Sequence, residues 1–70
     1  MRARGCGAMA KSYMVEFYDV ENEYMTGKAI TAKSADEAAE QAMEWARKHY
    51  ARKIIVSRGM TQWLYYVEGG

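Results

Sequence analysis

The segment after Ser34 constrains the fold of this chain most, because it combines a helix start signal with an alanine-rich apolar stripe. The Ser34 hydroxyl can accept a hydrogen bond from the Glu37 backbone N–H, while the Glu37 carboxylate reaches back to the Ser34 N–H, as in a capping box. No proline interrupts the segment, so we expect a helix from residue 35 to about residue 50. Its apolar positions recur at the i, i+3, i+4 spacing of one helix face: Ala35, Ala38, Ala39, Ala42, Met43, Ala46 and Tyr50.

Small side chains let this helix face lie close to a sheet, so the large core residues must come from strands. Alternation over residues 13 to 20 places Tyr13, Val15 and Phe17 on one face, which is typical of a half-buried strand. A β-branched run and an aromatic run later in the chain also favour strands. The expected strands cover residues 13 to 20, 24 to 33, 54 to 56 and 63 to 67.

The resulting order predicts an α+β fold: an antiparallel four-stranded sheet with one helix packed on one face, in the order β-β-α-β-β. Seventy residues make one small domain, which buries only about 60% of the surface of the unfolded chain. We assign the domain to residues 12 to 70. Residues 1 to 11 show no helical or strand period and are interpreted as a flexible N-terminal tail. With one helix, the opposite face of the sheet has no cover within the chain.

Charge is unevenly distributed along the chain, although its formal net value is only +1. The near-neutral total gives no reason to expect nucleic-acid binding from bulk charge. Residues 12 to 46 hold eight acids and two lysines, whereas residues 47 to 58 hold five bases and no acid. We interpret this basic segment as a patch for a nucleoprotein or acidic partner. The alternative is that its bases only balance the helix dipole and face solvent.

The cysteine count and the hydropathy of the chain indicate the cellular compartment in which we expect the protein. A single cysteine, Cys6, excludes an internal disulfide and fits a reducing cytosol. No run approaches the roughly 18 apolar residues of a membrane helix, and the N-terminus lacks the apolar stretch of a signal peptide. We therefore expect a cytoplasmic protein that does not associate with membranes.

Aromatic residues, nine of the 70, are the second indication of an interface. Alternation sends about half of the strand aromatics away from the helix. Either Trp63 and Tyr65 or Leu64 and Tyr66 point outward, and we take the first pair as candidates. An exposed aromatic patch commonly marks an interface, here with another protein or with a second copy of the chain as a homodimer. The candidate partner-binding residues are Tyr18, Lys28, Arg47, Lys48, Arg52, Lys53, Arg58, Trp63 and Tyr65.

Residues that could catalyse a reaction are few and isolated. His49, the only histidine, falls in the apolar arc of the expected helix and is interpreted as a packed or capping residue. Cys6 lies in the expected tail, and Ser57 has no identifiable activating base. One Cys and one His match no zinc spacing, and no phosphate-cradling glycine motif occurs. We expect no enzyme activity, no metal and no cofactor.

Two sets of spaced residues resemble one known family. The two sets are Gly27-x-x-Ile30-x-Ala32-x-Ser34-x-x-x-Ala38, and Gly59 followed by Trp63-Leu64-x-Tyr66-x-Glu68-x-Gly70. The resemblance is to the ninth family of type I-F anti-CRISPR proteins, small phage-encoded inhibitors with the same element order, and it covers about residues 13 to 70.

The resemblance implies a non-enzymatic inhibitor that acts in a bacterial host cell. It would bind backbone subunits of the type I Cascade surveillance complex and block hybridisation of target DNA to the guide RNA. A compact domain wedged in the channel for the guide–target duplex would act by sterics alone. The family is also linked to non-specific DNA binding through basic residues directly after the motif alanine. This chain has Ala39 and Glu40 there, so we do not expect this activity unless Arg47, Lys48, Arg52 and Lys53 take the place of those residues, and we expect any nucleic-acid contact to be incidental.

Two alternatives stay open. A HicB-type antitoxin would account for the pattern Tyr13-x-Val15-Glu16-Phe17-x-Asp19, but the usual Pro-Gly after the aspartate is missing. A small nucleic-acid-binding module would account for the basic segment. The GXXG loop of KH domains and the aromatic ribonucleoprotein motif are both absent, so such a module would bind without a recognised signature.

Overall fold

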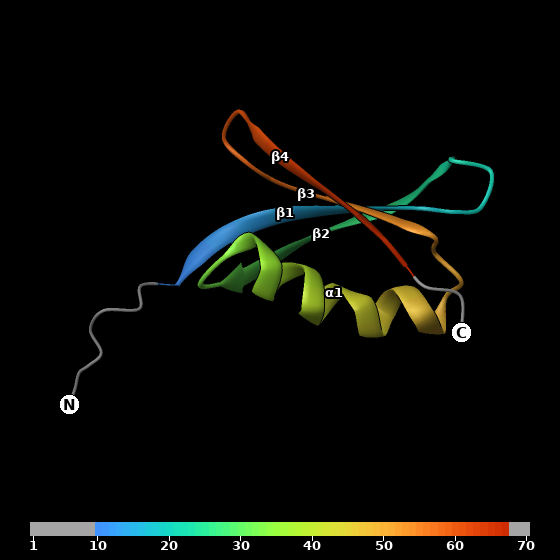
Figure 1. Ribbon diagram of the computed structural model, residues 1–70, viewed down its shortest axis with the longest axis horizontal. Helices are drawn as coiled ribbons and strands as arrows, with labels where there is room; N and C mark the ends of the chain where they lie inside the picture. The colour runs from blue at the N-terminus through green and yellow to red at the C-terminus, as the bar shows by residue number, and fades with distance from the viewer. Residues whose placement is uncertain (1–9, 68–70) are drawn as a thin grey trace.

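The computed structural model describes residues 10 to 67, which form a four-stranded antiparallel sheet with one helix lying across one face (Figure 1). The α+β class and the element order expected from the sequence are confirmed. The strand order in the sheet is β2-β1-β3-β4, so β1 and β3 are central. The elements are β1 (Lys11–Tyr18), β2 (Tyr24–Ala32), α1 (Ala35–Lys48), β3 (Lys53–Arg58) and β4 (Thr61–Tyr66).

Residues 1 to 9 of the proposed N-terminal tail lie outside the described residues. Lys11, which was assigned to that tail, is the first residue of β1 and pairs with Ala32 of β2. The strand therefore begins two residues before Tyr13.

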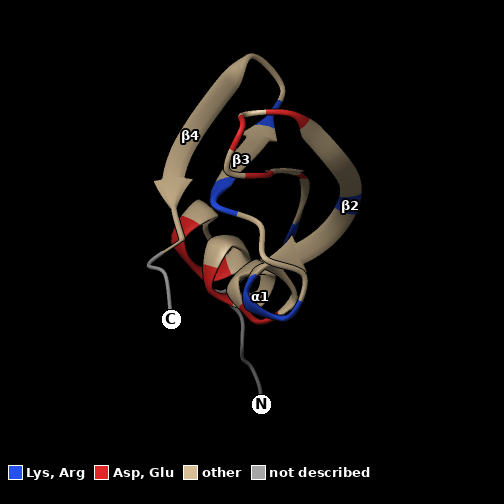
Figure 2. Cartoon of the chain, turned by 90° about the vertical axis from the view of Figure 1, so that its right-hand side faces the viewer, with Lys and Arg blue, Asp and Glu red and all other residues tan. Residues whose placement is uncertain are grey.

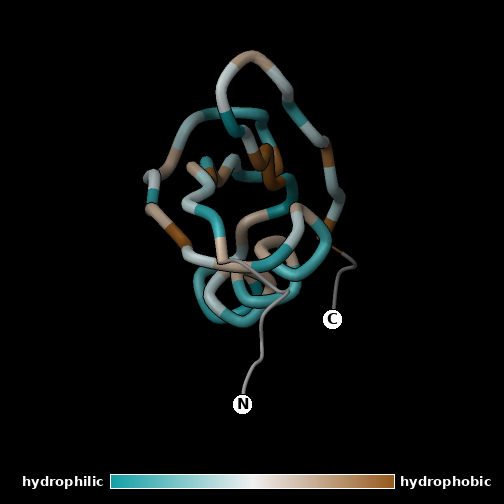
Figure 3. Tube along the Cα trace, turned by 90° about the vertical axis from the view of Figure 1, so that its left-hand side faces the viewer, coloured by the Kyte–Doolittle hydropathy of each residue, from teal (hydrophilic) through white to brown (hydrophobic). Residues whose placement is uncertain are grey.

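The core lies between α1 and the two central strands. Val15 pairs with Val56 and Phe17 pairs with Ile54, and all four of these side chains are fully buried. The helix contributes small residues to this layer, as expected from its alanine stripe. Figure 3 shows the strongest hydrophobic colour on the strands, whereas α1 carries hydrophilic and only weakly hydrophobic residues. The strands thus supply most of the core volume.

The helix begins at the serine that the sequence indicates, with one change in the capping pattern. The Ser34 hydroxyl accepts a hydrogen bond from the Glu37 N–H at 3.2 Å. The Glu37 carboxylate, however, accepts from the N–H of Lys33 at 3.2 Å and not from that of Ser34. The acids of the first turn and the bases of the last turn both suit the helix dipole.

The helix ends earlier than its apolar spacing predicts. His49 is the C-cap, and Tyr50 adopts a left-handed conformation with φ of 63°. The Ala51 N–H then donates to the Ala46 carbonyl at 2.9 Å, which is the six-to-one bond of a Schellman motif. Tyr50 is consequently 82% exposed, so the prediction that it belongs to the buried stripe is wrong. Ala51, which is buried, follows it into the core.

This helix end predicts a stabilising substitution. A bulky residue is disfavoured at positive φ, whereas glycine is favoured at this position of the motif. We expect Tyr50→Gly to raise the free energy of unfolding by about 0.5 to 1 kcal/mol in urea denaturation. The matched variant Tyr50→Ala removes the same exposed ring but keeps a β-carbon, and should change stability much less. Equal effects of the two variants would contradict the assignment of strain to the backbone.

Candidate functional site

The face of the sheet opposite α1, which we call the open face, is built by alternation along each strand. The pairing of Glu16 with Ile55, and of Ile55 with Leu64, sets its register across three strands. Within the described residues no helix or loop segment packs over it, because α1 packs on the other side. Its side chains come from Met14, Glu16 and Tyr18 on β1, Tyr24 and Ala29 on β2, Lys53, Ile55 and Ser57 on β3, and Gln62, Leu64 and Tyr66 on β4.

The open face exposes a concentration of apolar and aromatic groups. Met14, Tyr24 and Leu64 are each more than half exposed, and Tyr66 is 69% exposed. Ile55 lies between them at the centre of the sheet and is half-buried. Several exposed apolar side chains on one face are typical of a site that binds another macromolecule.

Tyr18 and Lys53 form a fixed cluster at one end of the open face. The Lys53 ammonium lies 4.8 Å from the centre of the Tyr18 ring and also donates a hydrogen bond to the Asn22 side-chain oxygen. The Tyr18 hydroxyl donates to the Glu16 carboxylate at 3.2 Å, and its ring meets the Tyr24 ring edge-on at 5.9 Å. Partial desolvation and the neighbouring Glu16 charge raise the pKa of Tyr18 above its usual value. The contacts with Tyr18 and Asn22 hold the Lys53 side chain against the protein surface.

An acidic turn borders this cluster. The Asp19 carboxylate accepts hydrogen bonds from the backbone N–H groups of Glu21 and Glu23, both at 2.9 Å, and so fixes the β1–β2 turn. A shallow pocket at this corner is lined by both Asp19 and Arg52. The bases of the open face thus have acids beside them, and the corner carries mixed charge.

The basic segment does not form one patch. Arg47 and Lys48 are exposed in the last turn of α1, and Arg52 is exposed on the connection that follows. Arg58 lies at the far end of β3, beside the turn to β4. Figure 2 shows these basic residues distributed over the helix end and along β3. The bases are close in sequence, but Arg58 lies at the opposite end of β3 from Lys53.

Three of the candidate residues lie on the helix side of the sheet. Trp63 packs edge-on against Tyr13 with ring centres 6.0 Å apart, and both Trp63 and Tyr65 contact the core. Lys28 faces α1, where its ammonium lies 5.0 Å from the centre of the Trp45 ring. The expectation that Trp63 and Tyr65 point away from the helix is wrong, because they pair with the buried residues of β3. The alternative pair, Leu64 and Tyr66, points outward.

Trp45 is a residue whose importance the apolar stripe does not reveal. Its ring packs against Phe17 at 4.5 Å between centres and stacks on the His49 ring at 4.1 Å. His49 also donates its backbone N–H to the Trp45 carbonyl at 3.1 Å. The histidine is thus a capping residue, as interpreted from the sequence, but it is exposed and not in the buried stripe. The Trp45 ring also lies close to Lys28 of β2, so Trp45 is over the β2 side of the core.

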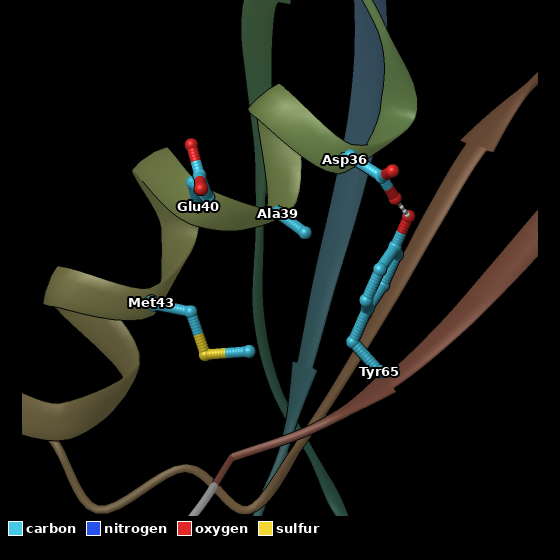
Figure 4. A pocket seen from close by; sticks show the side chains of 5 residues that line it. All are labelled: Asp36, Ala39, Glu40, Met43 and Tyr65. Carbon is cyan, nitrogen blue, oxygen red and sulfur yellow. Dashed lines mark hydrogen bonds between the residues drawn. The ribbon is translucent and has the colours of Figure 1, made fainter.

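A second surface feature lies on the other side of α1, between this helix and β4. A shallow cavity of about 290 Å³ is lined by Asp36, Ala39, Glu40, Met43 and Tyr65 (Figure 4). The Tyr65 hydroxyl donates to the Asp36 carboxylate at 2.7 Å and joins the strand to the helix. Partial burial, together with this hydrogen bond and the Asp36 charge, raises the pKa of Tyr65 to about 12.

Within residues 10 to 67, no group of three or more His, Cys, Asp or Glu side chains is arranged to hold a metal ion. No helix in this part of the chain is long and apolar enough to cross a membrane.

Comparison with known proteins adds no relative. The chain matches no family of proteins, and no curated protein or solved structure is significantly similar to it.

The Tyr65–Asp36 hydrogen bond predicts a loss of stability at high pH. The pKa of Tyr65 is about 12 in the folded protein and about 10 in an unfolded chain, so the folded state holds the phenol proton more tightly. Its stabilising contribution is therefore complete below about pH 10 and is lost as the pH rises toward 12. Near neutral pH we expect Tyr65→Phe to lower the free energy of unfolding by about 0.5 to 1 kcal/mol.

Urea denaturation of both proteins at several pH values checks this expectation. The difference between wild type and Tyr65→Phe should shrink as the pH approaches 12. Tyr66→Phe is the matched control, since it removes a hydroxyl from the exposed face of the same strand. A Tyr65→Phe difference that stays constant over this pH range would contradict a stabilising role of the phenol proton.

Proposed function

We propose that this protein is a non-enzymatic binding domain that inhibits a larger assembly by docking on it through the open face. The observation that carries the proposal is the exposure of Met14, Leu64 and Tyr66 around the half-buried Ile55. In the part of the chain that the structure describes, the core lies on one face of the sheet, so the opposite face can meet a partner. Aromatic and methionine side chains are enriched in the buried centres of protein interfaces.

Charge favours a protein partner over a nucleic acid. Glu16 lies on the open face itself, and the acids of the β1–β2 turn, Asp19, Glu21 and Glu23, border the cluster around Lys53. A strand of phosphates laid on this face would meet these carboxylates. A partner protein with an apolar centre and a mixed polar rim fits better.

The resemblance to the ninth family of type I-F anti-CRISPR proteins directs the proposal to one class of partner. In this proposal the domain binds backbone subunits of a type I Cascade complex and excludes target DNA from the guide RNA by occupying its channel. The element order agrees with that likeness. The residues that carry it are structural here: Ser34 caps α1, Ala38 is buried, and Trp63 packs on the core. Such residues support a similar fold, and the interface rests on other side chains.

The additional DNA-binding activity linked to that family is not part of the proposal. After the buried Ala38 the chain has Ala39, which is also buried, and Glu40, which is exposed and acidic. Arg47, Lys48 and Arg52 lie at the other end of the helix. The positions after the motif alanine therefore offer no cation to a phosphate backbone.

Inhibition is tested by target-DNA loading of a purified type I-F Cascade complex. We expect the protein to co-purify with the complex and to prevent loading of target DNA in a gel-shift assay. An effector complex that loads DNA normally at saturating amounts of the protein would refute the proposal. Stable association with a small toxin ribonuclease would favour the antitoxin alternative, and strongly salt-dependent binding to free nucleic acid would favour the nucleic-acid module.

The role of the open face is tested with a double variant. Leu64→Ser with Tyr66→Ser removes exposed apolar groups, and we expect binding to the effector complex to weaken at least about tenfold. Met60→Ser is the matched control, because Met60 is fully exposed but lies in the β3–β4 turn. Thermal denaturation shows whether each variant is folded. Equal binding by the double variant and the control would exclude the open face as the docking surface.

A further inference from the structure

β4 is an edge strand without the features that normally protect such an edge. Among residues 10 to 67 it is the outermost strand of the sheet, and its sequence, TQWLYY, contains no charge, no proline and no glycine. An edge strand presents unpaired backbone N–H and C=O groups, and proteins usually guard them with charges, prolines or bulges. The other edge, β2, has such guards: the charge of Lys28 and a register shift opposite Phe17 and Tyr18. The contrast indicates that the β4 edge is kept open for pairing.

The cavity beside β4 continues this edge on the helix side. The helix packs on β1, β2 and β3, and it leaves the space next to β4 unfilled. Ala39 and Met43 provide apolar surface in this space, while Asp36, Glu40 and Tyr65 surround it (Figure 4). Tyr65 is held in place by its 2.7 Å hydrogen bond to Asp36. An added strand would run past a preformed cavity.

The negative charge on the side of α1 that faces β4 determines which kind of added strand would fit. Asp36, Glu40 and Glu44 are spaced four residues apart, so they follow one another along one side of α1. Figure 2 shows acidic residues on the side of α1 that faces β4. A strand beside β4 sends alternate side chains toward the helix. Lysine or arginine at those positions would meet carboxylates, and their aliphatic stems would cover the apolar floor.

We propose that the free edge of β4 takes up an extended segment of a partner protein as a fifth strand, with lysine or arginine at the alternate positions that face α1. Main-chain hydrogen bonds supply the common part of such binding, and the side-chain sites supply the selectivity. This proposal concerns the edge of the sheet and is independent of docking on the open face.

A second copy of the chain is a poorer occupant of this edge. Antiparallel pairing of β4 with β4 of another copy by a two-fold axis would place both helices on the same face of one continuous sheet. The acidic side of α1 in each copy, which carries Asp36 and Glu40, would then lie next to the joint between the two sheets. Like charges brought together in this way oppose association, whereas a basic segment is attracted.

The test uses a capped synthetic peptide of alternating lysine and valine, about as long as β4, and a second peptide with glutamate in place of lysine. We expect the basic peptide to bind, to slow amide hydrogen exchange in Thr61–Tyr66, and to bind more weakly as salt is added. Glu40→Gln should weaken its binding about threefold. Glu21→Gln removes the same charge from the β1–β2 turn and should leave binding unchanged.

Several results would overturn the proposal. Equal binding of both peptides, or exchange protection confined to residues outside β4, would show that the peptide does not add to this edge. Protection of β4 that depends on protein concentration without peptide would identify a second copy as the occupant. Because the peptide assay needs no effector complex, it can succeed or fail independently of the inhibition assay.

Discussion

The close approach of an alanine-lined helix to two central strands determines the rest of this structure. Ala38 and Ala46 have no exposed surface, and neither do Val15 and Ile54, which the sheet presents to that side of the core. Because the helix side chains are small, the sheet must provide the volume, and it provides it from one face only. Residues 10 to 67 form one helix, so this part of the chain has no second layer to cover the other face. The open face is therefore a direct consequence of how the core is made.

Local sequence signals were sufficient to predict which helices and strands form. They were insufficient at the end of α1, where the backbone conformation of one residue determines where the helix stops. The start of α1 follows from Ser34 and the strands follow from alternation, because each of these signals acts within a few residues. The end of α1 does not follow from apolar spacing. Tyr50 has the right spacing for the stripe, but its positive φ stops the helix, and the buried position is taken by Ala51. Nothing in the side-chain pattern distinguishes these two outcomes.

The candidate site was predictable as a surface but not as a set of residues. Alternation requires that either Trp63 and Tyr65 or Leu64 and Tyr66 face outward, and both pairs are apolar enough for either role. The choice depends on pairing with β3, where Ile54 meets Tyr65 and Ile55 meets Leu64. Since Ile54, Ile55 and Val56 are all apolar, β3 does not reveal its own buried face in the sequence. The contact of Ile54 with the helix layer decides which face of β3 is buried, and pairing with β3 then decides which face of β4 is buried.

The arrangement of the strands also explains why the run of basic residues in the sequence does not form one basic surface. It further explains why β4 contributes to two surfaces. Between Arg47 and Arg58 the chain leaves α1, turns and runs the full length of β3, so Arg58 lies a strand length away from Lys53. β4, by contrast, contributes to both of the proposed binding surfaces. Leu64 and Tyr66 belong to the open face, whereas Tyr65 borders the acidic cavity and the backbone of the strand forms the free edge. A fifth strand added at that edge would widen the open face. Binding at either surface would therefore stabilise the strand that the other requires.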